Sequence, residues 1–297
     1  MNYDRIQVFG EVLFDIFPDQ SRVIGGAPFN VARHLRGMSL DPFFVSRVGN
    51  DDAGQEVRLQ MQEWGMDTGG LQVDPEKPTG RVLVKFHDNE PSYEIKEDAA
   101  FDRIEAVDSL EALQVGRTLF YHGTLAARSP RSSRTLYSLA KKSLQTVFCD
   151  INLRDPWWSP ELIRDILTWC NYLKVNLEEL DRVAGILGFR EEGVENMGRA
   201  VQERCRLQGL VLTMGSRGAM FFPSEGRPLF AAAPEVHGFK DSVGAGDSFS
   251  AVFMLGLCRN WSWERIMHSA VQTAARLCTI QGAVPDDRGF YSRLVDY

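Results

Sequence analysis

The sequence predicts an α/β fold in which helices cover both faces of a mostly parallel sheet, with a small β lid beside it. Beyond residue 115, short apolar segments alternate with longer helical ones, as in strands joined by crossover helices. The 297 residues, 44% of them hydrophobic, are enough to bury a large core in one large domain or two smaller ones. Residues 79–98 interrupt the alternation and predict the lid.

The first 65 residues predict strands and helices in turn. Pro28 follows Gly25-Gly26-Ala27 and suits the first turn of a helix, and the pair Asp51-Asp52 suits the positive end of the next helix dipole. The predicted elements are a strand over 6–17 that Gly10 interrupts, a helix through 30–35, a strand at 43–45 and a helix over 51–65.

Residues 79–98 have a period of two rather than a helical period. Val82, Val84 and Phe86 share one face, and Tyr93-Glu94-Ile95 follows a turn at Asn89-Glu90-Pro91. This spacing predicts a β hairpin. Lids of this kind exclude water and complete a site when they close.

The rest of the chain alternates between the two kinds of element. The predicted order is strand 117–121, helix 130–144, strand 146–150, helix 160–169, strand 171–175, helices near 178–186 and 193–206, and strand 209–213.

Composition excludes several classes of protein. The net charge of −7, from 33 basic and 40 acidic residues, gives no basic footprint for nucleic acid. Five scattered cysteines without a C-x-x-C pair argue against a disulfide framework and against zinc. No apolar stretch approaches the ~20 residues of a membrane span, and the N-terminal residues do not resemble a signal peptide. We expect a cytoplasmic location.

The most informative segment is Asp241-Ser-Val-Gly-Ala-Gly-Asp247-Ser-Phe249, a glycine turn that leads into an apolar helix. The N–H groups of Gly244, Ala245 and Gly246 then lie at a helix N-terminus, which favours an anion. Asp247 lies beside that anion site, and this combination suits transfer of a phosphoryl group to a hydroxyl. A P-loop motif, G-x-G-x-x-G after the first strand, G-x-S-x-G and H-E-x-x-H are all absent.

This segment resembles the second signature of the ribokinase-like (PfkB) carbohydrate kinases, and five further motifs agree with that family in the same order. Together they cover residues 6 to about 285 and imply one ribokinase-like three-layer domain over 1–297, with lid segments near 12–24 and 79–98. The motifs are Gly25-Gly-Ala-Pro-Phe-Asn30, Arg47-Val-Gly-Asn-Asp-Asp-Ala-Gly54, Asp150-Ile-Asn-Leu-Arg154 with Trp157, Asn176-Leu-Glu-Glu179 and Leu212-Thr-Met-Gly-Ser-Arg-Gly218.

The resemblance implies roles at the anion turn and in the sugar site. Asp247 is expected to be the general base that takes the proton of the attacking hydroxyl. The N–H groups of residues 244–246 are expected to stabilise charge on the phosphoryl group, and glycine there leaves room for its approach. The residues expected to bind the substrate are Asp15, Gly25, Gly26, Asn30, Arg81 and Arg154.

Two of these assignments stay open. Arg154 lies close to where phosphates are expected, or binds a carboxylate of a sugar acid. Arg81 points either to the sugar face of the lid or to solvent.

The resemblance also implies a nucleotide and metal side. Glu179 is expected to organise Mg2+ through water, which suits a cation that keeps its hydration shell. Asp241 resembles the residue of a monovalent-cation site, but Ser242-Val243 replaces the commoner pair of threonines, so K+ dependence stays open. The residues expected near ATP are Lys174, Asn176, Thr213, Gly215, Gly218 and Ala283.

The sequence therefore predicts an ATP- and Mg2+-dependent kinase of a sugar hydroxymethyl group, with fructose first. The Gly-Glu-x-Leu-x-Asp opening over residues 10–15 and the turn at 25–30 look fructokinase-like. A ketodeoxygluconate-type acid is second and a nucleoside third. A sugar sensor without catalysis is the alternative from another class. An exposed hairpin edge invites pairing, so a homodimer through the lid is a hypothesis.

Overall fold

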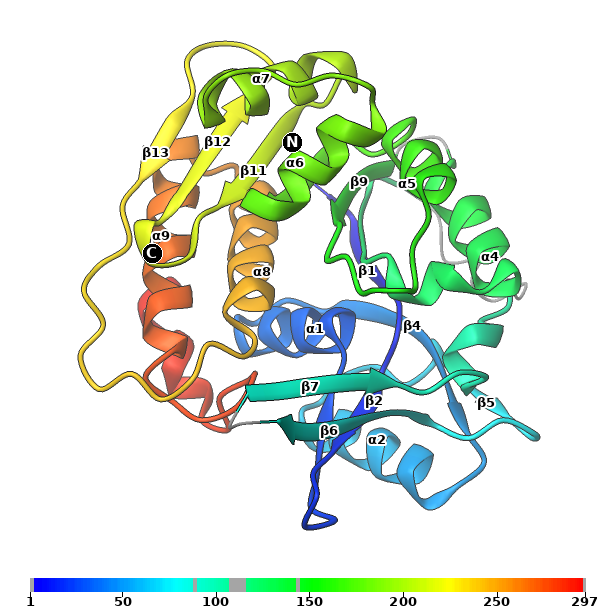
Figure 1. Cartoon of the computed structure of the whole chain (residues 1–297). Helices are drawn as coiled ribbons and strands as arrows, with labels where there is room; N and C mark the ends of the chain where they lie inside the picture. The colour runs from blue at the N-terminus through cyan, green and yellow to red at the C-terminus, as the bar shows by residue number, and fades with distance from the viewer. Residues whose placement is uncertain (1–2, 88–89, 107–115, 143–144, 296–297) are drawn as a thin grey trace.

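The computed structural model describes residues 3–87, 90–106, 116–142 and 145–295, and the strands of this part form two sheets (Figure 1). The large sheet has the order β13-β12-β11-β10-β9-β8-β1-β4-β5, and the small sheet has the order β3-β2-β6-β7. Neighbours from β5 to β11 are parallel, whereas β12 and β13 form an antiparallel edge.

The strands of the large sheet are β1 (Arg5–Phe9), β4 (Pro42–Gly49), β5 (Leu71–Asp74), β8 (Thr118–His122), β9 (Gln145–Asp150), β10 (Tyr172–Asn176), β11 (Gly209–Thr213), β12 (Ala219–Pro223) and β13 (Leu229–Ala231). Those of the small sheet are β2 (Leu13–Ile16), β3 (Arg22–Gly25), β6 (Gly80–His87) and β7 (Glu90–Ile95).

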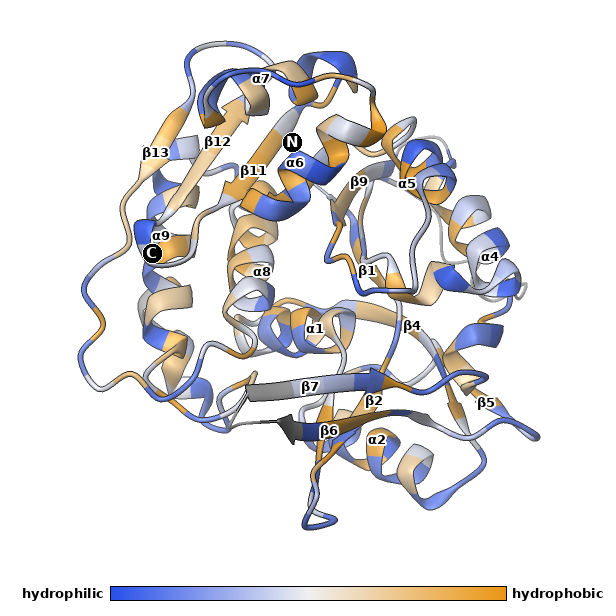
Figure 2. Ribbon diagram, viewed as in Figure 1, coloured by the Kyte–Doolittle hydropathy of each residue, from blue (hydrophilic) through white to orange (hydrophobic). Residues whose placement is uncertain are grey.

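Helices cover both faces of the large sheet, as expected. One apolar cluster joins it to α1, α2, α8 and α9, and a second cluster joins its other face to α4, α5, α6 and α7. Hydropathy follows this arrangement, because apolar colour lies on the strands and on the helix sides that face them (Figure 2). The helices are α1 (Ala27–Gly37), α2 (Asp52–Glu63), α4 (Pro130–Ala140), α5 (Pro160–Leu167), α6 (Leu177–Ile186), α7 (Val194–Arg204), α8 (Ala245–Cys258), α9 (Trp263–Leu277) and α10 (Ser292–Val295), with short 3-10 turns η1 (Ala100–Arg103), η2 (Leu125–Arg128), η3 (Gly215–Arg217) and η4 (Arg288–Tyr291).

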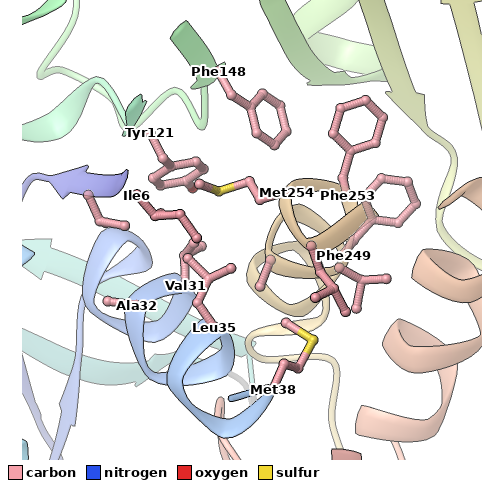
Figure 3. Close-up of a cluster of buried hydrophobic side chains, with 14 of the residues drawn as sticks. Ile6, Val31, Ala32, Leu35, Met38, Tyr121, Phe148, Phe249, Phe253 and Met254 are labelled. Atoms are coloured by element: carbon pink, nitrogen blue, oxygen red, sulfur yellow. The ribbon is translucent and has the colours of Figure 1, made fainter. Parts of the chain in front are cut away.

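Helix α8 is apolar around its whole circumference because it is covered on every side. Residues 248–257 are all buried, and the helix packs against α1, α9 and the sheet. Figure 3 shows Phe249 and Met254 gathered with Leu35 of α1, and with Tyr121 and Phe148 from the strands. This packing fixes the N-terminus of α8, and with it the glycine turn, at one end of the sheet.

The small sheet is the predicted lid, and the chain enters it directly from the large sheet. The expected strand over 6–17 is two strands, because the chain leaves β1 near Gly10 and pairs again as β2 in the other sheet. Strand β2 runs antiparallel to β3 and parallel to β6, and β6 pairs with β7. The turn residues 88–89 of the predicted hairpin lie outside the described residues.

Several elements differ from the sequence-based expectation. Strands β5, β12 and β13 were not predicted; β5 and β13 form the two edges of the large sheet and have only four and three residues, and β12 lies between β11 and β13. Helix α4 ends at Ala140 rather than 144, and residues 143–144 of that prediction lie outside the described part. Within the described residues, no helix is both long and apolar enough to cross a membrane.

Candidate active site

The glycine turn forms the N-terminus of α8, as the sequence predicted. Gly244 is the N-cap and adopts a left-handed backbone with φ of 75°. The Ala245 N–H donates to the Ser242 carbonyl at 3.2 Å, so that donor is used inside the turn. In the described part of the chain, the N–H groups of Gly244 and Gly246 make no such bond. Of the three N–H groups predicted to bind an anion, these two are therefore the ones left for it.

Glycine is required at position 244 because a backbone oxygen comes very close, and a side chain at position 246 would crowd a lysine. A Cβ on Gly244 would lie 2.3 Å from the carbonyl oxygen of Ala283, and a Cβ on Gly246 would lie 3.3 Å from the Lys174 Nζ. The structure thus brings the predicted residues Ala283 and Lys174 to the turn. His34 Nε2 lies 3.0 Å from the same Ala283 oxygen and donates to it, and His34 Nδ1 accepts from the Tyr291 hydroxyl at 2.6 Å.

Asp247 lies in the first turn of α8 and is half-buried. Burial raises the pKa of its carboxyl to about 6, and a hydrogen bond from Asn30 opposes that rise. Asn30 Nδ2 donates to Asp247 Oδ2 at 2.8 Å, which joins α1 to α8. A carboxylate with a pKa near neutrality is suited to act as a general base.

The predicted sugar turn lies beside Asp247. A Cβ on Gly25 would lie 3.2 Å from Asp15 Oδ2, so this glycine leaves room beside that carboxylate. Gly26, the N-cap of α1, has φ of 107° and a Cβ there would lie 2.6 Å from the backbone oxygen of Glu11. Burial raises the pKa of Asp15, and the charge of the exposed Arg154 opposes this shift.

The positive charge of Arg154 also opposes the rise in the pKa of Asp247. Arg81, in contrast, is not brought to Asp15 and Asp247. Strand register pairs Arg81 with Phe14, and the next pair along is Asp15 with Val82. Because successive side chains alternate between faces, Arg81 lies on the lid face opposite Asp15. It is exposed there, and its charge acts on Asp51 at the start of α2.

A buried ion pair lies beneath the turn. Lys174 Nζ is 2.6 Å from Asp150 Oδ2, and Ser250 Oγ and the Tyr121 hydroxyl donate to the same oxygen at 3.0 and 3.3 Å. Burial alone lowers the pKa of Lys174, but the Asp150 carboxylate outweighs that effect and raises it. Sequence reasoning gave Lys174 a role but missed Asp150 and Ser250, although Asp150 opens a motif that it singled out.

Asn176 and Glu179 form a capping box at the start of α6. Asn176 Oδ1 accepts from the Glu179 N–H at 2.9 Å, and Glu179 Oε2 accepts from the Asn176 N–H at 2.8 Å. Glu179 Oε1 accepts from the Leu153 N–H at 2.9 Å. Burial and the nearby Asp150 raise the pKa of Glu179. Each carboxylate oxygen has a second lone pair, so the residue still fits a water of a hydrated Mg2+ ion.

The other predicted nucleotide residues follow the neighbouring strand. Thr213 ends β11 and pairs in register with Asn176, and Gly215 and Gly218 have φ of 59° and 106° in the turn that follows. Asp241 accepts from the Val243 N–H at 2.9 Å and the Gly282 N–H at 3.1 Å, which ties the loop before α8 to the segment of Ala283. Among the described residues, no three His, Cys, Asp or Glu side chains gather as a metal-binding group.

The chain is similar to known sugar kinases over nearly its whole length. A family model described as pfkB family carbohydrate kinase matches residues 3–287. A fructokinase of Vibrio alginolyticus is 26% identical and is aligned over 91% of this chain and 90% of its own length. A 5-dehydro-2-deoxygluconokinase of Shouchella clausii is 24% identical, with 86% and 80% covered.

Solved structures share the fold. The aminoimidazole riboside kinase of Salmonella enterica, complexed with aminoimidazole riboside and an ATP analogue, superposes with a TM-score of 0.81 at 22% identity. The alignment covers 97% of this chain and all (100%) of that one. These relatives act on different acceptors, so the comparisons identify a class of kinase rather than one sugar.

Proposed function

This chain belongs to the pfkB family of carbohydrate kinases, and we propose that it transfers the γ-phosphoryl group of ATP to a hydroxymethyl group of a small sugar. The family makes it a phosphotransferase with a hydroxyl acceptor. The observation that carries the finer proposal is the 2.8 Å bond between Asn30 and Asp247, because it joins the sugar turn to the anion turn at the group that accepts the proton.

The chemistry follows from the charges around that bond. Asp247 takes the proton of the attacking hydroxyl, and its pKa of about 6 leaves it ionised at neutral pH. The N–H groups of Gly244 and Gly246 and the start of α8 stabilise the charge that develops on the phosphoryl oxygens. The ammonium of Lys174 lies against Gly246 below the same site, where it is paired with Asp150.

Mg2+ bound with ATP would neutralise charge on the phosphates. Glu179 and Asn176 are the proposed holders of its water shell, and Thr213, Gly215 and Gly218 are proposed to line the nucleotide site. Asp241 is the proposed monovalent-cation residue; both of its oxygens already accept backbone N–H groups, and each retains a second lone pair.

Fructose is the first proposed acceptor. The similarity to fructokinases supports it, together with the opening at residues 10–15 that ends in Asp15. The deoxygluconokinase relative keeps a sugar acid as the second candidate, with Arg154 as its carboxylate partner. A cytoplasmic location and a homodimer through the lid belong to the same proposal, and light scattering at micromolar concentration tests the dimer.

The test is ADP release with ATP and Mg2+ over fructose, ribose, ketodeoxygluconate, fructose phosphates and adenosine, with Asp247→Ala as control. The expected result is a sugar-dependent signal that falls by ~10² or more in the variant. A signal that is unchanged in the variant removes Asp247 as the base. Sugar binding without ADP release would support the sensor instead.

A further inference from the structure

Glu11 is a buried carboxylate at the floor of the site that the proposed mechanism does not use. Its side chain follows β1, only 4% of the residue is exposed, and Oε2 has no hydrogen-bond partner in the described part of the chain. Burial raises the pKa of Glu11 to about 7; the nearby Asp247 also raises it, and the positive charges of Arg154 and Arg128 oppose the rise. Burial raises the pKa of the Tyr121 hydroxyl, and the charges of Asp247 and Glu11 add to that rise. These three polar groups therefore lie near one another at the base of the site, which we call the floor.

Arg128 is a fixed guanidinium with one unused nitrogen in the same region. Its Nε and Nη2 donate to the two Asp102 oxygens at 2.7 and 2.8 Å, and Nη2 donates to the Lys96 carbonyl at 2.7 Å, next to the end of lid strand β7. The rings of Phe101 and Trp157 lie 4.8 and 4.4 Å from its central carbon. Within the described residues, Nη1 is buried without a partner.

Two such atoms, on side chains near enough to interact electrostatically, indicate a missing ligand group. A buried polar atom left without a hydrogen bond is costly, so proteins rarely keep one without a reason. Glu11 and Arg128 do not bond to each other, but a hydroxyl both donates and accepts and therefore satisfies both. The last torsion of a glutamate is broad, so Oε2 turns toward a ligand at low cost.

The charge balance of the floor favours an uncharged ligand. Arg128 is neutralised by Asp102, and Lys174 is neutralised by Asp150. The groups that remain are the carboxylates of Asp15 and Asp247, and Glu11, whose pKa burial raises to about 7, against the single guanidinium of Arg154. A substrate carboxylate would add a further negative charge to a group that is already acidic on balance.

We propose that Glu11 and Arg128 bind hydroxyl groups of the acceptor and select an uncharged polyhydroxy sugar over a sugar acid. This inference rests on the proposed kinase function and deepens it. It adds two residues to the predicted substrate-binding set, of which Glu11 belongs to the opening motif over residues 10–15. It also decides between the two leading candidate acceptors in favour of fructose-type sugars.

The experiment compares kcat and KM of the wild-type protein and Glu11→Gln with fructose and with 2-dehydro-3-deoxygluconate. We expect wild-type kcat/KM to be at least about 10-fold higher for the neutral sugar, because like charges brought together are costly. Glu11→Gln is expected to raise the KM for the sugar by about 10- to 100-fold, as for loss of a bond to a charged group. The KM for ATP should not change, and the preference for the neutral sugar should narrow.

Glu191→Gln, on the surface, is the matched control, and thermal melting checks that each variant is folded. An unchanged sugar KM in a folded Glu11→Gln protein, or a wild-type preference for the acid, overturns the inference and leaves the kinase assignment intact. If Glu11→Gln does not fold, the ratio of wild-type kcat/KM for the neutral sugar to that for the acid decides whether the inference stands. Absence of turnover with every sugar refutes the proposed function, and this inference with it.

Discussion

The bond from Asn30 to Asp247 makes a quantitative prediction about pH. Burial raises the pKa of Asp247 to about 6, and the 2.8 Å bond from Asn30 holds it below the value that burial alone would give. The base acts when ionised, so kcat/KM should rise with pH through this pKa of the free enzyme. Asn30→Ala removes a donor that stabilises the ionised form, so the rise should move to higher pH.

The size of the movement follows from the strength of one hydrogen bond. A bond to a charged group contributes about 1.5–3 kcal/mol, and one pKa unit corresponds to about 1.4 kcal/mol. The midpoint of the rise should therefore move upward by about 1 to 2 pH units in Asn30→Ala. Loss of Asn30 as a sugar ligand changes the height of the profile, but not its midpoint.

The assay is the initial rate of ADP release from pH 5 to 9 at low sugar concentration. A phosphate of ATP itself titrates near pH 6, so the difference between variants is the readout rather than the absolute midpoint. Asn196→Ala, at an exposed position of α7, is the control and should keep the wild-type midpoint. Asp247→Asn should lose about 10²- to 10⁴-fold in kcat. An Asn30→Ala profile with the wild-type midpoint would refute the assigned role of this bond.

Three further predictions concern the surroundings of the anion turn. Gly244→Ala places a Cβ 2.3 Å from a backbone oxygen and should lower both the melting temperature and kcat. The control, Gly188→Ala, has φ of 77° and nothing within 4 Å, so it should cost only about 1 kcal/mol of stability. Equal losses of stability in the two variants would contradict the steric argument. Lys174→Met leaves Asp150 charged, buried and unpaired, so denaturant titration at pH 7 should show a loss of about 3–5 kcal/mol, largely regained when Asp150→Asn is added, without recovery of activity. Tyr291→Phe removes the hydroxyl that orients His34 against the Ala283 carbonyl beside the turn. The KM for ATP should therefore rise several-fold while the KM for sugar stays unchanged. The opposite pattern would assign this contact to the sugar site.

The two glycine turns of the site could be predicted from the sequence because a glycine often marks a position where a side chain would not fit. Gly244 and Gly26 each leave out a Cβ that a backbone oxygen forbids, and such positions are visible in a chain as glycines next to a helix start. The lid was equally visible, since the period of two over residues 79–98 differs from the surrounding helical period. The missed edge strands β5 and β13 are short and partly exposed, so they have little apolar signal, whereas β12 is apolar and mostly buried and this explanation does not cover it.

The polar partners of the site could not be predicted because they come from distant parts of the chain and depend on burial. Nothing near Glu11 in the sequence indicates that it becomes one of the more buried carboxylates. Nor does it indicate that Glu11 interacts electrostatically with Asp247, which is distant in the chain. The same holds for Arg81, whose face follows from the register of β2 against β6 and not from its own neighbours. A one-residue change of that register would move the side chains of β6 to the opposite face of the lid. The side chains that the lid presents to the site therefore depend on strand pairing, which cannot be read from one sequence.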